Sequence, residues 1–156
     1  MWLGFVHSGF TVSDLDRSVS WYSSVLGLSV LRRQLSDNAY TRRIVGMPDA
    51  VLELAFLGFP AGSPAAGAPI IELMQYLQPA GRTPDLRTSD VGVGHIALAV
   101  SDLAAEYERL RAQGVEFRNP PVEIDAGLNR GAWACYLLDP DGITIELMQP
   151  APGKAV

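Results

Sequence analysis

The pentapeptide IELMQ occurs twice in this chain, at Ile71–Gln75 and again at Ile145–Gln149. In each copy a glutamate, Glu72 or Glu146, stands inside an apolar run that is typical of a β-strand. Burying a carboxylate among such residues costs free energy unless a partner compensates its charge. The repetition therefore suggests that the chain is internally duplicated and that the two glutamates share one role.

A second set of matching residues supports the duplication. The tetrapeptide VSDL occurs at Val12–Leu15 and at Val100–Leu103, and His7 and His95 each stand five residues before it. These matches share an offset of 88 residues, whereas the IELMQ copies are 74 residues apart. Several matches at one offset indicate a repeat, so the first half carries an insertion between its histidine and its glutamate.

Each half is predicted to contain a strand, a helix and then about three strands. The helices are predicted over Leu15–Leu26 and Leu103–Gln113, because an acidic or serine cap precedes each one and a glycine follows. The predicted strands are Gly4–Thr11, Ser29–Gln34, Ala50–Leu57 and Pro69–Leu77 in the first half, and Gly92–Val100, Val115–Arg118, Gly131–Leu138 and Ile143–Gln149 in the second. This order predicts an α+β fold in which helices cover one face of mixed sheets.

The polar stretch Gln78–Asp90 separates the two halves. It contains two prolines and shows no apolar period, which is typical of a linker. We therefore expect a first βαβββ module over residues 1–78, a linker over 79–90, a second module over 91–150 and a C-terminal tail over 151–156.

The composition excludes several classes of protein. Twelve basic residues against seventeen acidic ones give a formal net charge of −5, so no nucleic-acid partner is expected. No apolar run approaches the roughly 20 residues that span a bilayer, and the N-terminus lacks the features of a signal peptide. The single cysteine, Cys135, excludes an internal disulfide. We expect a cytoplasmic homodimer that acts on a small molecule, without a membrane partner.

Four residues at equivalent positions of the two halves favour a metal site. His7 and His95 are the only histidines, and each is matched by a glutamate on the last strand of its half, Glu72 or Glu146. Two imidazoles and two carboxylates form a ligand set that suits Zn, Ni, Co, Mn or Fe, and the carboxylates would balance the charge of a divalent ion. The alternative is that the histidines are structural residues and that the glutamates face solvent.

The sequence also resembles a known family. FVHSGFTVSDLDRSVSWYSSVLGLSVLRR, GVGHIALAVSDLAAEYERLRAQGVEF and YLLDPDGITIELMQP resemble module segments of the vicinal oxygen chelate superfamily. That superfamily includes glyoxalase I, methylmalonyl-CoA epimerase, extradiol dioxygenases, and fosfomycin and bleomycin resistance proteins. The resemblance implies paired βαβββ modules in a curved eight-stranded mixed sheet around a divalent metal ion. It also implies that His7, Glu72, His95 and Glu146 are the metal ligands.

The identity of the second ligand favours one branch of chemistry. The resemblance implies a histidine at that position in the dioxygenases, where this chain has Glu72. A fourth protein ligand leaves about two positions on an octahedral ion, enough for a chelating substrate. We therefore expect an isomerase, epimerase or lyase that transfers a proton next to a carbonyl or thioester. The alternatives are an extradiol-type dioxygenase and a non-catalytic binder of the antibiotic-resistance kind.

Proton transfer requires a base, for which the sequence offers two kinds of candidate. Glu53 lies in an apolar strand that is expected to pair with the strand of Glu72, and the epimerase resemblance implies a base there. The glyoxalase I resemblance implies instead that a ligand glutamate, Glu72 or Glu146, takes the proton. Neither branch matches fully, because Thr11 stands where bacterial glyoxalase I has an arginine, and Gly94 where the epimerases have a further histidine.

Overall fold

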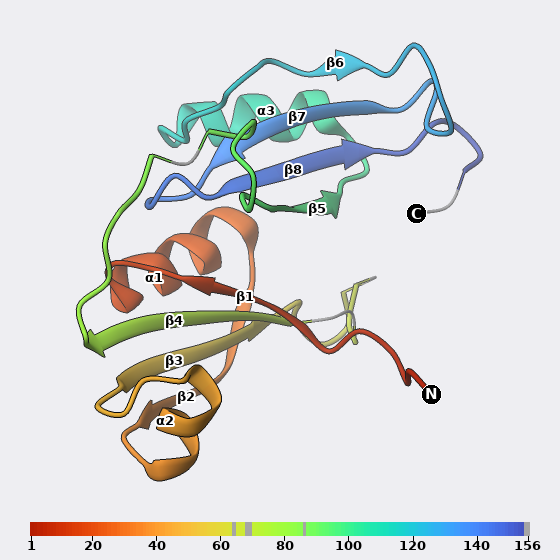
Figure 1. Ribbon diagram of the computed structural model, residues 1–156. Helices are drawn as coiled ribbons and strands as arrows, with labels where there is room; N and C mark the ends of the chain where they lie inside the picture. Colours follow the sequence, from red (N-terminus) through yellow and green to blue (C-terminus); the bar gives the residue numbers. More distant parts are fainter. Residues whose placement is uncertain (64, 68–69, 86, 155–156) are drawn as a thin grey trace. The chain divides into compact units, whose positions relative to one another are not determined.

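The chain folds into two compact units, Met1–Pro84 (unit 1) and Asp85–Val156 (unit 2) (Figure 1). The computed structural model describes residues 1–63, 65–67, 70–85 and 87–154. The strands are β1 (His7–Thr11), β2 (Ser29–Ser36), β3 (Val51–Gly58) and β4 (Ile70–Gln78) in unit 1, and β5 (His95–Ala99), β6 (Val122–Glu123), β7 (Trp133–Leu138) and β8 (Thr144–Gln149) in unit 2. The helices are α1 (Leu15–Leu26), α2 (Ala39–Val45) and α3 (Leu103–Ala112).

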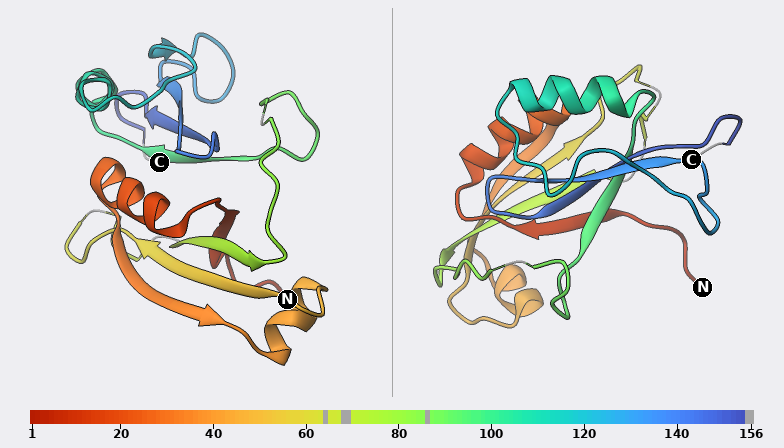
Figure 2. Two further views of the ribbon diagram at one scale, coloured as in Figure 1. Left: turned by 90° about the vertical axis from the view of Figure 1, so that its left-hand side faces the viewer. Right: turned by 90° about the horizontal axis from the view of Figure 1, so that it is seen from above.

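Both units have the same topology. The strand order is β1-β4-β3-β2 in one sheet and β5-β8-β7-β6 in the other. The first strand of each unit pairs in parallel with the last, and the remaining pairs are antiparallel. One helix, α1 or α3, lies across one face of each sheet (Figure 2). The predicted α+β fold of two βαβββ modules is confirmed, with the eight strands divided between two hydrogen-bonded sheets of four.

Four elements differ from the sequence-based prediction. Helix α2 was not predicted, although Asn38 caps its first turn and Gly46 ends it in the left-handed conformation. The segment Val115–Arg118 makes only an isolated bridge to β7 through Phe117, and the ladder resumes at β6 after Pro120 and Pro121, which lack a backbone N–H. Strand β1 begins at His7 rather than Gly4, and strand β5 at His95 rather than Gly92. Pro69, where strand β4 was predicted to begin, lies outside the described residues.

The repeated pentapeptide organises the packing between sheet and helix. Ile71 and Leu73, like Ile145 and Leu147, are buried on the helix-covered face of their sheets. The glutamine that ends each copy faces the same way: Oε1 of Gln75 accepts a hydrogen bond from the Leu15 backbone N–H at 2.8 Å, and Oε1 of Gln149 accepts one from Leu103 at 2.8 Å. Each glutamine therefore satisfies an otherwise unpaired N–H in the first turn of its helix.

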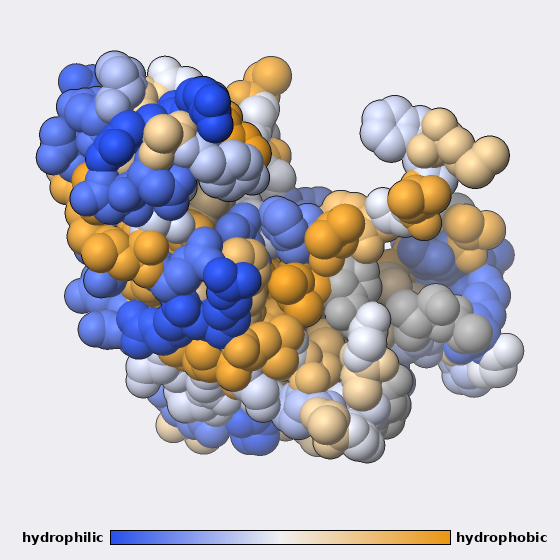
Figure 3. All heavy atoms as spheres, turned by 90° about the horizontal axis from the view of Figure 1, so that it is seen from below, coloured by the Kyte–Doolittle hydropathy of each residue, from blue (hydrophilic) through white to orange (hydrophobic). Residues whose placement is uncertain are grey.

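Large apolar side chains stay exposed in unit 1, on β2, on α2 and before β1. They include Phe5, Leu31, Leu35, Tyr40 and Ile44. Figure 3 shows one face of the molecule on which apolar side chains gather between hydrophilic ones. Such surface is typical of a contact with another protein, and the homodimer stays a prediction. None of the described helices combines the length and the apolar character that crossing a membrane requires.

Candidate functional site

In unit 1 the structure brings His7 and Glu72 together. The parallel ladder pairs Gly9 with Glu72, so His7 lies two residues away from that position on the same face of the sheet. Nε2 of His7 lies 3.1 Å from Oε2 of Glu72. The carboxylate side chain is 15% exposed and the imidazole 40%, so both groups can be reached by a ligand.

Unit 2 repeats this arrangement with His95 and Glu146. The ladder pairs Ala97 with Glu146, and Nε2 of His95 lies 3.2 Å from Oε2 of Glu146. The side chains are 44% and 18% exposed, close to the values in unit 1. The same strand register, contact distance and exposure show that the duplication built one histidine–glutamate pair twice.

A small residue stands between the members of each pair. An added Cβ on Gly9 would lie 3.2 Å from the terminal methyl of Met74 and 3.5 Å from Oε2 of Glu72. The equivalent residue in unit 2 is Ala97, which is 88 residues later. Small side chains here keep the face open beside the carboxylate.

Sequence reasoning missed an aromatic residue that lies across from each glutamate. Phe56 pairs with Glu72, and Tyr136 pairs with Glu146. The Tyr136 ring lies 5.3 Å from the His95 ring, centroid to centroid. Burial, and then the charge of Glu146, raise the pKa of Tyr136, so its hydroxyl is protonated at neutral pH. The sequence shows both aromatic residues in predicted strands, but it does not show that they lie opposite the glutamates, because that depends on the register between the strands.

Glu53 does not lie on the same face of the sheet as the histidine–glutamate pair of unit 1. Strand β3 does pair with β4, as predicted, but Glu53 is opposite Gln75, whereas Glu72 is opposite Phe56. Because side chains alternate between faces, Glu53 shares the α1-covered face with Gln75, and Glu72 points to the other face. Glu53 lines a cavity of about 230 Å³ there, together with Leu15, Arg33, Gln34, Leu35 and Leu54. This placement argues against Glu53 as the base beside the histidine–glutamate pair.

Cys135 is buried and is not a candidate nucleophile. The residue is only 1% exposed to solvent. Burial, and secondarily the charge of Glu146, raise the pKa of the thiol to about 11. A reactive cysteine is usually a thiolate in an accessible, electropositive place, so Cys135 is a packing residue.

Each unit offers half of the predicted ligand set. In the described part of the chain, no group of three or more histidine, cysteine, aspartate or glutamate side chains is arranged to hold a metal ion. Each unit does supply an imidazole nitrogen and a carboxylate oxygen about 3 Å apart on an accessible face. This separation allows both atoms to bind the same ion, so the donors fit half of a mixed nitrogen and oxygen site.

Comparison with known proteins gives the family. The model of the Glyoxalase/Bleomycin resistance protein/Dioxygenase superfamily matches residues 4–147. A lactoylglutathione lyase of Haemophilus influenzae is 34% identical over 152 residues, which is 96% of this chain and 95% of that protein. A 2-epi-5-epi-valiolone epimerase of an Actinomyces species is 32% identical over 151 residues, which is 94% of this chain and 79% of that protein.

Two further relatives match nearly all of this chain but differ in how much of their own length is matched. The lactoylglutathione lyase GLX1 of Arabidopsis thaliana is 30% identical over 95% of this chain, which spans only 44% of that protein. The crystal structure of a glyoxalase family protein from Bacillus cereus shares the fold, with a TM-score of 0.75 and 24% identity over 97% of this chain and 96% of that one. The chain belongs to the Glyoxalase/Bleomycin resistance protein/Dioxygenase superfamily.

Proposed function

We propose that this chain is a divalent-metal-dependent isomerase, epimerase or lyase that transfers a proton on a carbon next to a carbonyl or thioester. The observation that carries the proposal is the histidine–glutamate pair that both units build with the same register and separation. A pair kept in both halves is hard to explain by packing, since its imidazoles are 40% and 44% exposed. The relatives named as a lyase and an epimerase support the same class of reaction.

The metal ligands we propose are His7, Glu72, His95 and Glu146. A divalent ion held there, whether Zn, Ni, Co, Mn or Fe, would act as a Lewis acid toward a substrate oxygen. A site with all four ligands needs the pair of each unit, supplied either by one chain or by two copies in a homodimer. The carboxylates offset the charge of the ion, which accounts for two glutamates on otherwise apolar strands.

The base we propose is Glu146. Its carboxylate lies on the same strand face as the Tyr136 hydroxyl, whereas Glu72 faces the apolar ring of Phe56. Displaced from the ion, Glu146 would take the proton from the substrate carbon and return it to the adjacent carbon in a lyase or isomerase. In an epimerase, a second acid would return a proton to the opposite face of the same carbon. Tyr136, protonated at neutral pH, can donate a hydrogen bond to a substrate oxygen.

The residue at position 11, a threonine, indicates which substrates the site can recognise. It shares the strand face of His7, two residues beyond Gly9, and it stands where the glyoxalase I resemblance implies an arginine. Without a cation at this position, the carboxylate of a glutathione adduct has no partner there. We therefore propose that the substrate is a carbonyl or thioester compound whose recognition does not depend on an anionic group at Thr11.

The test combines metal analysis with a panel of substrates. Protein purified without added ions is expected to contain about one divalent ion per chain. Turnover of the methylglyoxal–glutathione hemithioacetal, of 2-methylmalonyl-CoA and of a catechol is then measured with Ni, Co, Zn, Mn and Fe, under nitrogen and in air. Proton transfer that is independent of oxygen supports the proposal. Activity only with Fe(II), with oxygen consumed in step, would show a dioxygenase; bound metal without turnover of any substrate would favour a binding protein.

A further inference from the structure

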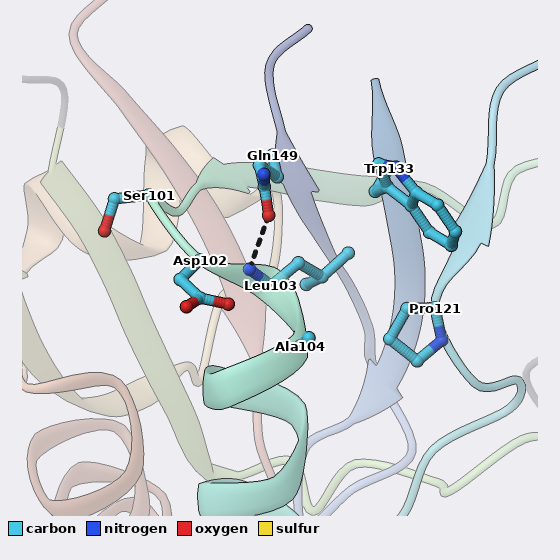
Figure 4. A pocket seen from close by; sticks show the side chains of 7 residues that line it. All are labelled: Ser101, Asp102, Leu103, Ala104, Pro121, Trp133 and Gln149. Atoms are coloured by element: carbon cyan, nitrogen blue, oxygen red, sulfur yellow. Dashed lines mark hydrogen bonds between the residues drawn. The ribbon is translucent and has the colours of Figure 1, made fainter. Parts of the chain in front are cut away.

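A second cavity lies in unit 2, apart from the histidine–glutamate pair. It has a volume of about 400 Å³ and lies between the start of α3 and strand β7 (Figure 4). Its lining residues are Ser101, Asp102, Leu103, Ala104, Pro121, Trp133 and Gln149. Trp133 and Pro121 form one side, and the first turn of α3 forms the other (Figure 4).

This cavity opens on the opposite face of the sheet from the candidate metal ligands. Trp133 pairs with Gln149, and Tyr136 pairs with Glu146, which are three residues later on β7 and three residues earlier on β8. An odd separation places Trp133 and Glu146 on different faces. The hydrogen bond from the Leu103 N–H to Gln149 confirms that the Trp133 face is the one that α3 covers. A ligand here would therefore not occupy the proposed reaction site.

The duplication shows that the fold does not require a tryptophan at this position. In unit 1 the residue opposite the equivalent glutamine, Gln75, is Glu53. In both units the glutamine accepts a hydrogen bond from the first turn of the helix, so the backbone arrangement is the same. The side chain opposite the glutamine differs between the units. Trp133 is also 41% exposed, which leaves much of the indole in contact with solvent. The indole is better explained by a ligand than by packing.

The charges around the cavity select the sign of that ligand. Asp102 is the charged residue among those lining the cavity, and its exposed carboxylate is not held by any basic neighbour there. Two backbone N–H groups that could have attracted an anion are engaged, Leu103 by Gln149 and Ala105 by Asp102. An anion would be repelled by the Asp102 carboxylate, whereas a cation is attracted by both the carboxylate and the indole face.

We propose that this cavity binds a small organic cation with a compact apolar body, such as a quaternary ammonium compound. The apolar groups of the ligand contact Leu103, Pro121 and the indole of Trp133, which attracts the positive charge through its π electrons. Asp102 supplies the counter-charge at the other side of the cavity. The site is independent of the proposed reaction, so either can fail without the other.

The test uses choline, its neutral isostere 3,3-dimethylbutan-1-ol and the anion 3,3-dimethylbutanoate. Each is titrated into the full chain while the indole N–H signal of Trp133 is followed by nuclear magnetic resonance; Trp133→Leu assigns that signal among the three tryptophans. Choline is expected to shift the Trp133 signal saturably. The neutral alcohol is expected to bind at least about fivefold more weakly, and the anion more weakly still.

Two variants separate charge from folding. Asp102→Asn keeps the oxygen that accepts from the Ala105 N–H, so α3 stays capped, and is expected to weaken choline binding about fivefold. Asp14→Asn makes the same change at the cap of α1 and is expected to leave choline binding unchanged.

Two further variants test the indole by calorimetry. Trp133→Leu is expected to lose at least about tenfold in affinity for choline, and Trp133→Phe, which keeps a π face, is expected to retain most of it. Equal binding of choline and the neutral alcohol, or an Asp102→Asn variant that binds as wild type does, would overturn the proposal.

Discussion

Glu53 and Glu146 carry the same carboxylate group, but the residues around the two groups differ. Glu146 lies 3.2 Å from an imidazole nitrogen and opposite a tyrosine, and Glu53 lies beside Arg33 on the helix-covered face of the other unit. A general base must come within hydrogen-bond reach of the proton that it removes. Position relative to the histidine therefore decides which glutamate can serve.

The first prediction compares these two residues. Glu146→Gln is expected to lower kcat by roughly 10² to 10⁴, because the amide cannot accept the substrate proton. Glu53→Gln is the matched control, with an expected change in kcat of less than about threefold. The measurement is solvent-deuterium exchange at the substrate carbon, with the metal content of each variant determined in parallel. Loss of exchange in Glu53→Gln at full metal content would contradict the assignment.

The second prediction concerns the thiol of Cys135. Its pKa is raised to about 11, so at pH 8 nearly all of the thiol is protonated and the nucleophilic thiolate is scarce. Native protein is expected to react with a thiol-specific reagent at well below a tenth of the rate of denaturant-unfolded protein, because burial adds to this effect. Because the pKa is raised, the native rate should still be rising as the pH passes from 8 to 10. Rapid stoichiometric labelling of folded protein at pH 7 would disprove it.

At the scale of elements, Gln75 and Gln149 connect the last strand of each unit to its helix. The bond lengths are equal, at 2.8 Å, and each glutamine satisfies the N–H of the first helical residue. The repeated pentapeptide thus combines two buried aliphatic residues on the helix-covered face, a glutamate and a methionine on the other face, and a glutamine that accepts a hydrogen bond from the helix. This division of roles explains why all five residues recur.

The third prediction follows from that contact. Gln75→Leu and Gln149→Leu are each expected to lower the free energy of unfolding by about 1–2 kcal/mol, because a half-buried N–H loses its acceptor. Gln75→Glu keeps an oxygen acceptor and should retain most of the stability, aided by the helix dipole. Urea denaturation measures the change. Gln78→Leu, at an exposed glutamine that bonds Asp49, is the control and should change stability by less than about 0.5 kcal/mol.

At the scale of the whole molecule, each unit holds one histidine–glutamate pair, and a four-ligand site needs both pairs. In a homodimer that shares its sites, each site takes His7 from one copy and His95 from the other. Exposed apolar side chains in unit 1 are a suitable surface for such an association. The two possible assemblies, within one chain or between copies, can be separated by mixing inactive variants.

The fourth prediction is the outcome of that mixing. His7→Ala and His95→Ala are each expected to lose metal and activity, because a ligand is removed from every site. When the two variants are unfolded together and refolded, heterodimers that share sites contain one intact site, so activity should return to about a quarter of the wild-type level. Each variant refolded alone is the control. If the mixture stays inactive while light scattering shows dimers, the site forms within one chain.

The sequence by itself determined the duplication, the α+β class and the residues that would form each histidine–glutamate pair. These follow from local signals: matched offsets, caps around α1 and α3, and the period of two in strands that carry Glu72 and Glu146. The exceptions are also local, since α2 is short and the Val115–Arg118 segment is cut off from β6 by two prolines.

Only the tertiary structure decided which face each residue occupies. The alternation of side chains along β3 shows that Glu53 and Phe56 lie on opposite faces of the sheet. It does not show which of the two shares a face with Glu72. That choice depends on the register between β3 and β4, which are joined by a long loop rather than a tight turn, so no short-range rule sets it. The register places Phe56 opposite Glu72 and Tyr136 opposite Glu146, and it places Glu53 and Trp133 on the helix-covered faces. A shift of one residue would exchange every side chain between the two faces.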